Sequence, residues 1–183
     1  MVVGGTPSSR RALLTATGAF LIAGCGSSRS VSHATKGTLV AFADIVLLNR
    51  LIDLENVAVA AYAAAVPLLP PRAVPAAKRF LGQELDHVDG LSRLVRDAGG
   101  KPHKPPPSYD LGHPRGAGDI LQLLHRLETA QLAAYLDTIP RLDPGPVRAM
   151  TAAFFANDAQ HVSILRAELG RTALPSALVT GDE

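Results

Sequence analysis

The sequence lacks tryptophan and holds one cysteine, two methionines and only 4% aromatic residues among its 183 residues. A single cysteine excludes an intrachain disulfide framework and leaves little support for thiol-redox chemistry. The charges nearly balance, with 18 Lys and Arg against 16 Asp and Glu, so we expect no nucleic-acid partner. Neither a Ser-His-Asp pattern nor a phosphate-binding loop is present in the sequence, which argues against a hydrolase. The length and a hydrophobic content of 47% suit one globular domain.

The excess of positive charge belongs to the N-terminal 24 residues. Arg10 and Arg11 precede a short apolar run from Ala12 to Gly24, and the rest of the chain has 16 basic and 16 acidic residues. Thirteen helical residues extend about 20 Å, too short to cross a hydrocarbon core of about 30 Å. A basic start followed by a short apolar run and small residues is typical of an export signal.

The arginine pair resembles a twin-arginine signal, and Ile22-Ala23-Gly24-Cys25 resembles a bacterial lipobox. This resemblance implies that residues 1–24 are removed and that Cys25 carries lipid; the alternative is a plain signal peptide with an incidental cysteine. Residues 25–37, rich in Ser, Gly and Thr, are expected to form a flexible tether. The protein would then be exported and lipid-anchored to the outer face of the bacterial cytoplasmic membrane or envelope.

From residue 38 onward the apolar residues repeat with a helical period, and strand signals are absent. The pattern predicts helices over about 38–66, 72–98, 119–139 and 144–170, joined by a short, a long and a short connection. Asp119 and Asp143 are the expected N-caps of the third and fourth helices. The fold class predicted is therefore all-α: a four-helix bundle over residues 38–170 with a long crossover between helices two and three, followed by a C-terminal tail at 171–183.

The inward face of each predicted helix is apolar except at its middle, where one carboxylate replaces the expected Leu or Val. These carboxylates are Glu55, Glu84, Glu128 and Asp158. Burying a carboxylate in a bundle core is costly unless an opposite charge compensates it. Four carboxylates at one level therefore indicate a bound cation.

Two of these carboxylates are followed three residues later by histidine, in Glu84-Leu85-Asp86-His87 and Asp158-Ala159-Gln160-His161. Residues three apart lie on one face of a helix, so both side chains of each pair can ligate one ion. An internal repeat supports this pairing, because a tyrosine follows seven residues after the glutamate in both Glu55–Tyr62 and Glu128–Tyr135. The two glutamates are separated by nearly the same number of residues as Glu84 and Asp158. A duplicated helical hairpin would place the two halves of a binuclear site symmetrically.

At these residues the sequence resembles the ferritin-like di-iron carboxylate superfamily, and more closely its exported bacterial members of the ferritin-like or desiccation-related type. The resemblance implies that Glu55 and Glu128 each bind one metal, that Glu84 and Asp158 bridge, and that a nitrogen comes from each of His87 and His161. It also makes Tyr62 and Tyr135 candidates for hydrogen bonding to the ligands or for electron donation; the alternative is that they only fill the core.

One residue departs from the family pattern, which has Glu where this chain has Asp158. The missing methylene shortens the reach by about 1.5 Å, so the bridge can fail and leave one ion in place of two. Two iron ions are the expected cofactor, with Mn or Zn as alternatives. Weaker candidates near the site are His125, Asn157 and Gln131. His125 is expected on the helix surface, with a hydrogen bond to the ligands as the alternative. Asn157 is expected to be a polar neighbour, and Gln131 either takes the place of an imidazole on the third helix or only hydrogen-bonds. His33, His103 and His113 in the tether and link are given no ligand role, and Lys101, Lys104 and Arg115 are expected to be solvated.

These features predict an oxidative function: Fe(II) oxidation or reduction of O2 or peroxide at a bridged metal pair. Whether the chain is an enzyme is left open, and the alternative is a non-catalytic cell-envelope protein that uses a metal, or only the bundle, for structure or stress-related binding. The expected partners are the membrane, through lipid at Cys25, and metal ions with O2 or peroxide. An oligomer is compatible with the sequence, but a closed storage cage is not expected of a lipid-anchored subunit.

Overall fold

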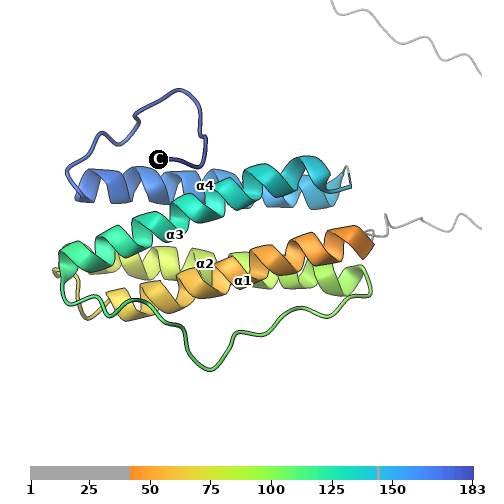
Figure 1. Ribbon diagram of the computed structural model, residues 1–183, viewed down its shortest axis with the longest axis horizontal. Coiled ribbons are helices and arrows are strands. Elements are labelled where there is room, and N and C mark those ends of the chain that lie inside the picture. The colour runs from red at the N-terminus through yellow and green to blue at the C-terminus, as the bar shows by residue number, and fades with distance from the viewer. Residues whose placement is uncertain (1–41, 144) are drawn as a thin grey trace, which may run out of the picture. The chain divides into compact units, whose positions relative to one another are not determined.

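The computed structural model describes residues 42–143 and 145–183 (Figure 1). Four helices make up most of this part of the chain: α1 (Phe42–Ala65), α2 (Val74–Asp97), α3 (Ala117–Thr138) and α4 (Pro146–Glu168), with a short 3-10 helix, η1 (Ile139–Arg141), after α3. The described residues contain no strand, and the predicted all-α four-helix bundle is confirmed. The predicted signal peptide, Cys25, the tether and His33 lie outside the described residues.

The helix ends follow the chain's prolines and glycines. After α2, Gly99 adopts a φ of 78°, and its amide and that of Gly100 bond back to carbonyls of the last helical turn. Gly170 ends α4 in the same way with a φ of 70°. Because a positive φ is strained for residues with a Cβ, these glycines terminate the helices at the predicted points.

The two predicted N-caps are wrong. Helix α3 begins after Gly116, and Asp119 lies inside its first turn, where its carboxylate accepts a hydrogen bond from the Arg115 amide at 3.1 Å. Helix α4 begins after Gly145, whose φ is 108°, and the amide of Asp143 instead donates to the carboxylate of Asp44. The N-cap of helix α3, Gly116, thus lies three residues before the predicted one. Asp119 still stabilises the helix, because an acidic side chain in the first turn interacts favourably with the helix dipole.

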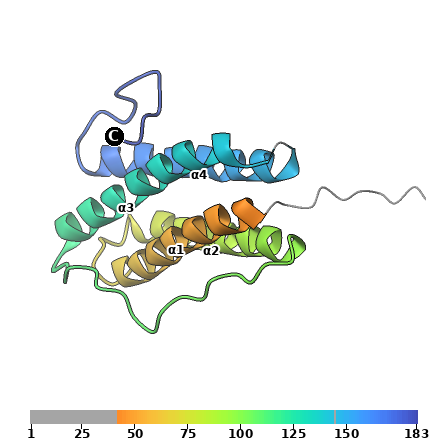
Figure 2. The same ribbon diagram turned by 45° about the vertical axis from the view of Figure 1, so that its right-hand side comes forward.

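The helices form two hairpins, α1 with α2 and α3 with α4, and α1 also packs against α3. The connection between α2 and α3 runs along the outside of the α1–α2 hairpin in both views (Figures 1 and 2). Asn49 and Asp53 on α1 fix its start: the Asn49 side chain bonds to the backbone of Lys101 and His103, and the His103 ring lies 2.9 Å from Asp53. The predicted long crossover therefore follows a defined course along α1.

The core consists of two apolar clusters at opposite ends of the bundle. One includes Leu48, Ile52, Leu91 and Val147, and the other includes Tyr62, Phe80, Ile120, Leu124 and Leu165. Between them lies a layer of buried polar side chains contributed by all four helices. Packing on both sides of this layer excludes water from it, which raises the energetic cost of any unpaired charge there.

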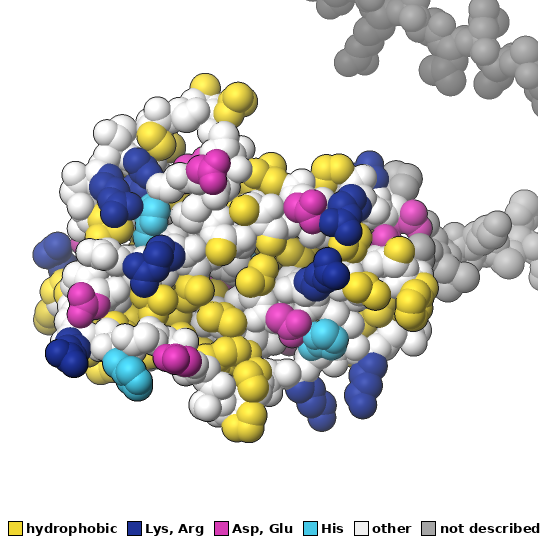
Figure 3. All heavy atoms as spheres, in the orientation of Figure 1, with side chains coloured by type: hydrophobic (Ala, Val, Ile, Leu, Met, Phe, Trp, Pro, Cys, Tyr) yellow, Lys and Arg dark blue, Asp and Glu magenta, His cyan; other side chains and the backbone are white. Residues whose placement is uncertain are grey.

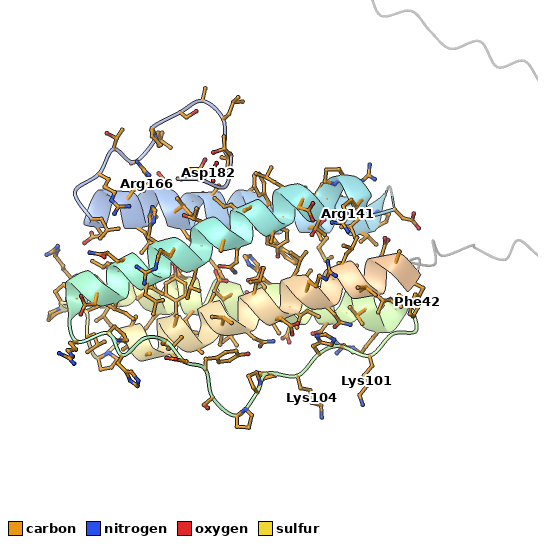
Figure 4. The ribbon with its side chains drawn as sticks, in the orientation of Figure 1. Phe42, Lys101, Lys104, Arg141, Arg166 and Asp182 are labelled. Carbon is orange, nitrogen blue, oxygen red and sulfur yellow. The ribbon has the colours of Figure 1, made fainter. Side chains whose placement is uncertain are left out.

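On the side that Figure 3 shows, basic and acidic side chains of the described residues are interspersed, and neither charge dominates the surface. Lys101 and Lys104 point away from the bundle into solvent (Figure 4), as the sequence predicted for the link, and Arg115 is also exposed. Within residues 42–143 and 145–183, none of the helices has the length and apolar character needed to span a membrane.

Candidate metal centre

The polar layer brings together the six side chains that the sequence singled out. Their exposed fractions range from 0% to 4%. Each helix contributes at the middle of its length: α1 and α3 one carboxylate each, and α2 and α4 a carboxylate and a histidine each. The members are Glu55, Glu84, His87, Glu128, Asp158 and His161.

The layer divides into two groups with the spacing of a metal site, each with ligand atoms within 4.8 Å of one another. The first group comprises Glu84, Glu128, Asp158 and His161, and the second comprises Glu55, Glu84 and His87. Glu84 belongs to both groups and therefore lies where a bridging carboxylate is needed. Asp158 belongs to the first group alone, although its Oδ1 lies 3.3 Å from His87 Nδ1 of the second group.

Both histidines turn Nδ1 toward the carboxylates. His161 Nδ1 lies 3.1 Å from Glu128 Oε1 and 3.0 Å from Glu84 Oε1. His87 Nδ1 lies 3.3 Å from Asp158 Oδ1 and 3.5 Å from Glu55 Oε2. The imidazole atom that faces the carboxylates is thus the same in both halves.

The opposite hairpin fixes the other side of each ring. His161 Nε2 lies 2.9 Å from the side-chain oxygen of Gln83, and Asn157 lies beside His87. Gln83 and Asn157 each precede the carboxylate of their own helix by one residue. An amide oxygen that accepts from Nε2 leaves Nδ1 free to bind a metal.

Each imidazole also packs on a phenylalanine from the opposite hairpin. Phe80 stacks on His161 with a centroid distance of 4.0 Å, and Phe154 packs on His87 at 4.5 Å. Phe80, Phe154 and Gln83 were not predicted from the sequence to contact the site histidines. A signal existed, because the pairs Phe80/Phe154, Gln83/Asn157, Glu84/Asp158 and His87/His161 all have the same offset in the sequence.

The two tyrosines bond across the bundle. The hydroxyl of Tyr62 donates to Glu128 Oε1 and that of Tyr135 donates to Glu55 Oε1, both at 2.5 Å. Each tyrosine therefore orients the carboxylate of the other hairpin. Seven-residue spacing places each tyrosine two turns from the glutamate of its own helix, so only the tertiary packing reveals which carboxylate it reaches.

Gln131 breaks the symmetry of the layer. Its Nε2 donates to Glu55 Oε2 at 2.7 Å and to Glu84 Oε2 at 3.0 Å. The corresponding position in the first hairpin, at the offset that relates Glu55 to Glu128, is Ala58. Two oxygens of the Glu55, Glu84 and His87 group thus accept hydrogen bonds from an amide that has no counterpart in the other group.

Burial and mutual repulsion shift the proton affinities of the layer. Burial raises the pKa of Glu128 to about 7, and burial together with neighbouring carboxylates raises the pKa of Glu55 and Asp158 well above their usual values. Burial opposes the charged form of His161, but hydrogen bonds and charges from Glu128 and Glu84 raise its pKa to about 10. Burial lowers the pKa of His87. The metal-free layer therefore holds protons where a cation would compensate the charge.

Several buried atoms of the layer make no hydrogen bond among the described residues, although His87 Nδ1 and Asp158 Oδ1 lie within ion-pair distance of each other. They include Glu128 Oε2, His87 Nδ1, Gln131 Oε1 and both carboxylate oxygens of Asp158. Buried polar atoms are normally paired, and unpaired ones in a native fold need an explanation. Oxygen and imidazole donors that converge without partners fit a divalent cation, so this donor set suits iron, manganese or zinc.

The remaining candidates lie away from the layer. His125 was expected on the helix surface, which is wrong: it is only 6% exposed, because the C-terminal segment packs beside it and faces it with Arg171 and Glu183. This segment folds back on the bundle, where Arg166 donates to the Thr172 carbonyl at 2.7 Å (Figure 4). His103 and His113 are exposed, and His103 pairs with Asp53 outside the bundle.

Comparison with known proteins supports the same fold. A family model for the ferritin-like domain matches residues 43–171. Among solved structures, the chain resembles a conserved hypothetical protein, Rv2844, from Mycobacterium tuberculosis, with a TM-score of 0.67 and 18% identity over 69% of this chain and 97% of that one. No curated protein matches the sequence. Since the family model spans all four helices and the whole polar layer, the chain belongs to the ferritin-like domain family.

Proposed function

We propose that the polar layer binds two divalent metal ions, iron in the first place, and that the loaded site oxidises Fe(II) or reduces O2 or peroxide. One observation carries the proposal: two groups of buried ligand atoms share Glu84 and include unpaired oxygens and an unpaired nitrogen. A carboxylate common to two groups is the arrangement that a binuclear centre requires.

Charge balance favours two ions. Four buried carboxylates would carry four negative charges, and two divalent cations compensate them without the protons that burial otherwise retains. Glu55 with His87 would hold one ion and Glu128, Asp158 and His161 the other, with Glu84 between them. Manganese and zinc suit the same donors, so availability in the cell envelope decides the metal.

The chain's own residues would hold the site rigid and dry. Tyr62 and Tyr135 orient the two terminal carboxylates, and Phe80 and Phe154 fix the imidazole rings from the opposite hairpin. The two apolar clusters exclude bulk water from the layer. A bound iron pair would supply one electron from each ion, the two needed to reduce O2 to peroxide or peroxide to water.

The cellular place of this chemistry is part of the same proposal. The arginine pair and the lipobox-like segment before Cys25 support export and lipid attachment, with residues 25–37 as a tether between membrane and bundle. An enzyme held outside the cytoplasmic membrane would meet O2, peroxide and Fe(II) in the envelope. Closed cages of the protein are not expected, because a lipid-anchored subunit is hard to build into a shell.

A second candidate is a non-catalytic site that holds one structural ion. The observation in its favour is the asymmetry of the layer: Asp158 belongs to one group alone, and Gln131 occupies two oxygens of the other. A single ion among Glu84, Glu128, Asp158 and His161 would then stabilise the bundle in a stress-related envelope protein.

Anaerobic titration with Fe(II), followed by elemental analysis and exposure to O2, separates these functions. We expect about two ions per chain and O2-dependent oxidation, both impaired by Glu84→Gln because the shared carboxylate is lost. Asp89→Asn on the exposed face of the same helix is the matched control and should behave as the unmodified protein. One tightly bound ion without O2 consumption would favour the structural function, and no bound metal would exclude both.

A further inference from the structure

A cavity of about 70 Å³ lies beside the polar layer, at the end of the bundle where α2 begins and α4 ends. Its walls are mainly apolar and include Ala76, Ala77, Phe80, Leu124 and Ile164. Tyr62 also lines it. Two of its lining side chains contact the candidate ligands directly, since Tyr62 donates to Glu128 and Phe80 stacks on His161.

The pseudo-symmetric position at the other end of the bundle carries larger side chains. Three alanines line the cavity at positions 73, 76 and 77, and their counterparts at the offset that relates Phe80 to Phe154 are Val147, Met150 and Thr151. Val147 and Thr151 are 4% and 0% exposed. Val147 and Thr151 thus occupy buried space in the second half of the repeat, while Met150 is 36% exposed.

A glycine adds to this asymmetry. Gly90 on α2 lies so close to the ring of Phe154 that a Cβ at residue 90 would be 2.5 Å from the ring's Cζ atom. The counterpart of Gly90 is Ile164, which lines the cavity and is 43% exposed. Phe154 can therefore pack directly against the neighbouring helix, whereas Ile164 stands in the wall beside Phe80.

The chemistry of the cavity suits a small uncharged apolar molecule. The hydroxyl of Tyr62 already donates its hydrogen bond to Glu128, so it has no proton to donate to a polar ligand in the cavity. On the solvent side, Arg72 and Glu168 pair at 3.3 Å and compensate each other's charge, so they do not attract a free cation. The pocket is partly open to solvent, but its mainly apolar walls offer water few hydrogen bonds, so a small apolar guest such as xenon can displace that water.

We propose that this cavity admits dioxygen to the side of the metal centre formed by Glu84, Glu128, Asp158 and His161. Its size accommodates a diatomic molecule, and Phe80 and Tyr62 form the last barrier before the ligands. Fe(II) and hydrogen peroxide, both strongly hydrated, would enter elsewhere. The role as a reactant's route depends on the proposed function, but the uptake of an apolar molecule does not.

Xenon under pressure is the probe for the uptake step. We expect the NMR signals of Ala76, Ala77 and Ile164 in the metal-free protein to shift with xenon pressure and to saturate. Ala76→Met, which copies Met150 of the other half, should abolish the shifts; Ala73→Val, which copies Val147, should weaken them and serves if the first variant does not fold. Absence of shifts at these residues in the unmodified protein would overturn the proposal, whatever its metal content.

The reaction step is tested by loading the same proteins with Fe(II) without oxygen and mixing them with O2. We expect Ala76→Met to bind the same amount of Fe(II) and to oxidise it about tenfold more slowly, while Ala152→Met on the exposed face of α4 changes neither. Equal oxidation rates in variants that have lost xenon binding would overturn the proposal. If the unmodified protein bound no Fe(II), the proposed function would be wrong, a result recorded separately from the xenon shifts.

Discussion

The hydroxyl of Tyr62 on α1 lies 2.5 Å from Oε1 of Glu128 on α3, and Tyr135 on α3 bonds to Glu55 on α1 in the same way. These two bonds cross between the hairpins inside a layer without bulk water. Each holds a carboxylate in place before any ion binds, so the tyrosines contribute both to the stability of the bundle and to the geometry of the candidate metal centre.

Replacing either tyrosine by phenylalanine removes one donor to a buried carboxylate. We expect Tyr62→Phe and Tyr135→Phe each to lower the free energy of unfolding of the metal-free protein by about 1–3 kcal/mol, measured by urea denaturation. Tyr109→Phe is the control, since this third tyrosine lies in the link outside the layer. Equal stability of all three variants would show that the two hydrogen bonds contribute nothing measurable.

The pKa values predict how the metal-free protein responds to alkaline pH. The pKa of His161 is raised from 6.5 to about 10, so the folded state binds more protons than the unfolded state within this range. The free energy of unfolding should therefore fall as pH rises from 6.5 to 10. Glu128, with a pKa raised from 4.5 to about 7, acts in the same direction at lower pH, where the lowered pKa of His87 opposes it.

Urea denaturation across this alkaline range measures the effect, and His161→Gln should flatten the curve. Metal binding should show the opposite trend, because protons on the ligands must leave before an ion binds. Zinc affinity should thus increase with pH over the range in which the metal-free protein loses stability. A flat profile for the unmodified protein would contradict the raised pKa of His161.

Gln131 should lower the affinity of one of the two metal positions. Gln131→Ala releases the Oε2 atoms of Glu55 and Glu84, so we expect zinc to bind the Glu55, Glu84 and His87 group about tenfold more tightly. The metal-free protein should lose about 1–2 kcal/mol of stability through the missing hydrogen bonds. Calorimetric titration with zinc measures both sites, and Gln122→Ala on the exposed face of α3 is the control.

Lengthening the side chain at residue 158 tests whether its reach limits the binding of a second ion. Asp158→Glu adds one methylene, which should bring the carboxylate closer to Glu55 and Glu84 of the second group and tighten the binding of a second ion by about tenfold. The addition to a fully buried position should cost about 1–3 kcal/mol in the metal-free protein. Zinc titration measures the affinity for the second ion, and Asp97→Glu at an exposed position is the control. An unchanged affinity for the second ion would mean that the length of the side chain at residue 158 does not limit its binding.

Lipid attachment has a direct test in the complete chain. Cys25→Ser should move the protein from the membrane fraction to the soluble fraction of exported protein and abolish labelling by a fatty-acid analogue. Ser27→Ala, two residues into the proposed tether, is the matched control and should leave the protein with the membrane. Retention of Cys25→Ser at the membrane would rule out anchoring through this residue.

The fold and the members of the polar layer could be predicted from the sequence because both are local patterns. Helical periodicity and terminal Gly and Pro residues indicate where each helix runs, and the periodic inward face shows that Glu55, Glu84, Glu128 and Asp158 replace apolar residues. The exact helix starts could not be predicted in this way, because Asp119 and Asp143 match a capping signal whereas Gly116 and Gly145 stand at the N-cap positions.

Contacts between the helices were decided by the tertiary structure. That Tyr62 reaches Glu128, that Gln131 bridges Glu55 and Glu84, and that His125 is covered by the C-terminal segment depend on the separation and rotation of packed helices. A helical sequence defines which face a side chain shares, but the partner across the bundle is defined only when the faces pack.

The sequence by itself therefore determined four helices, a duplicated hairpin and a set of inward carboxylates and histidines, since each follows from periodicity along one helix. The tertiary structure decided the division of that set into two groups around Glu84 and the cavity beside Phe80. Both depend on distances between helices. The alanines of α2 leave a space beside Phe80, whereas the space above Gly90 is filled by Phe154 of the facing helix.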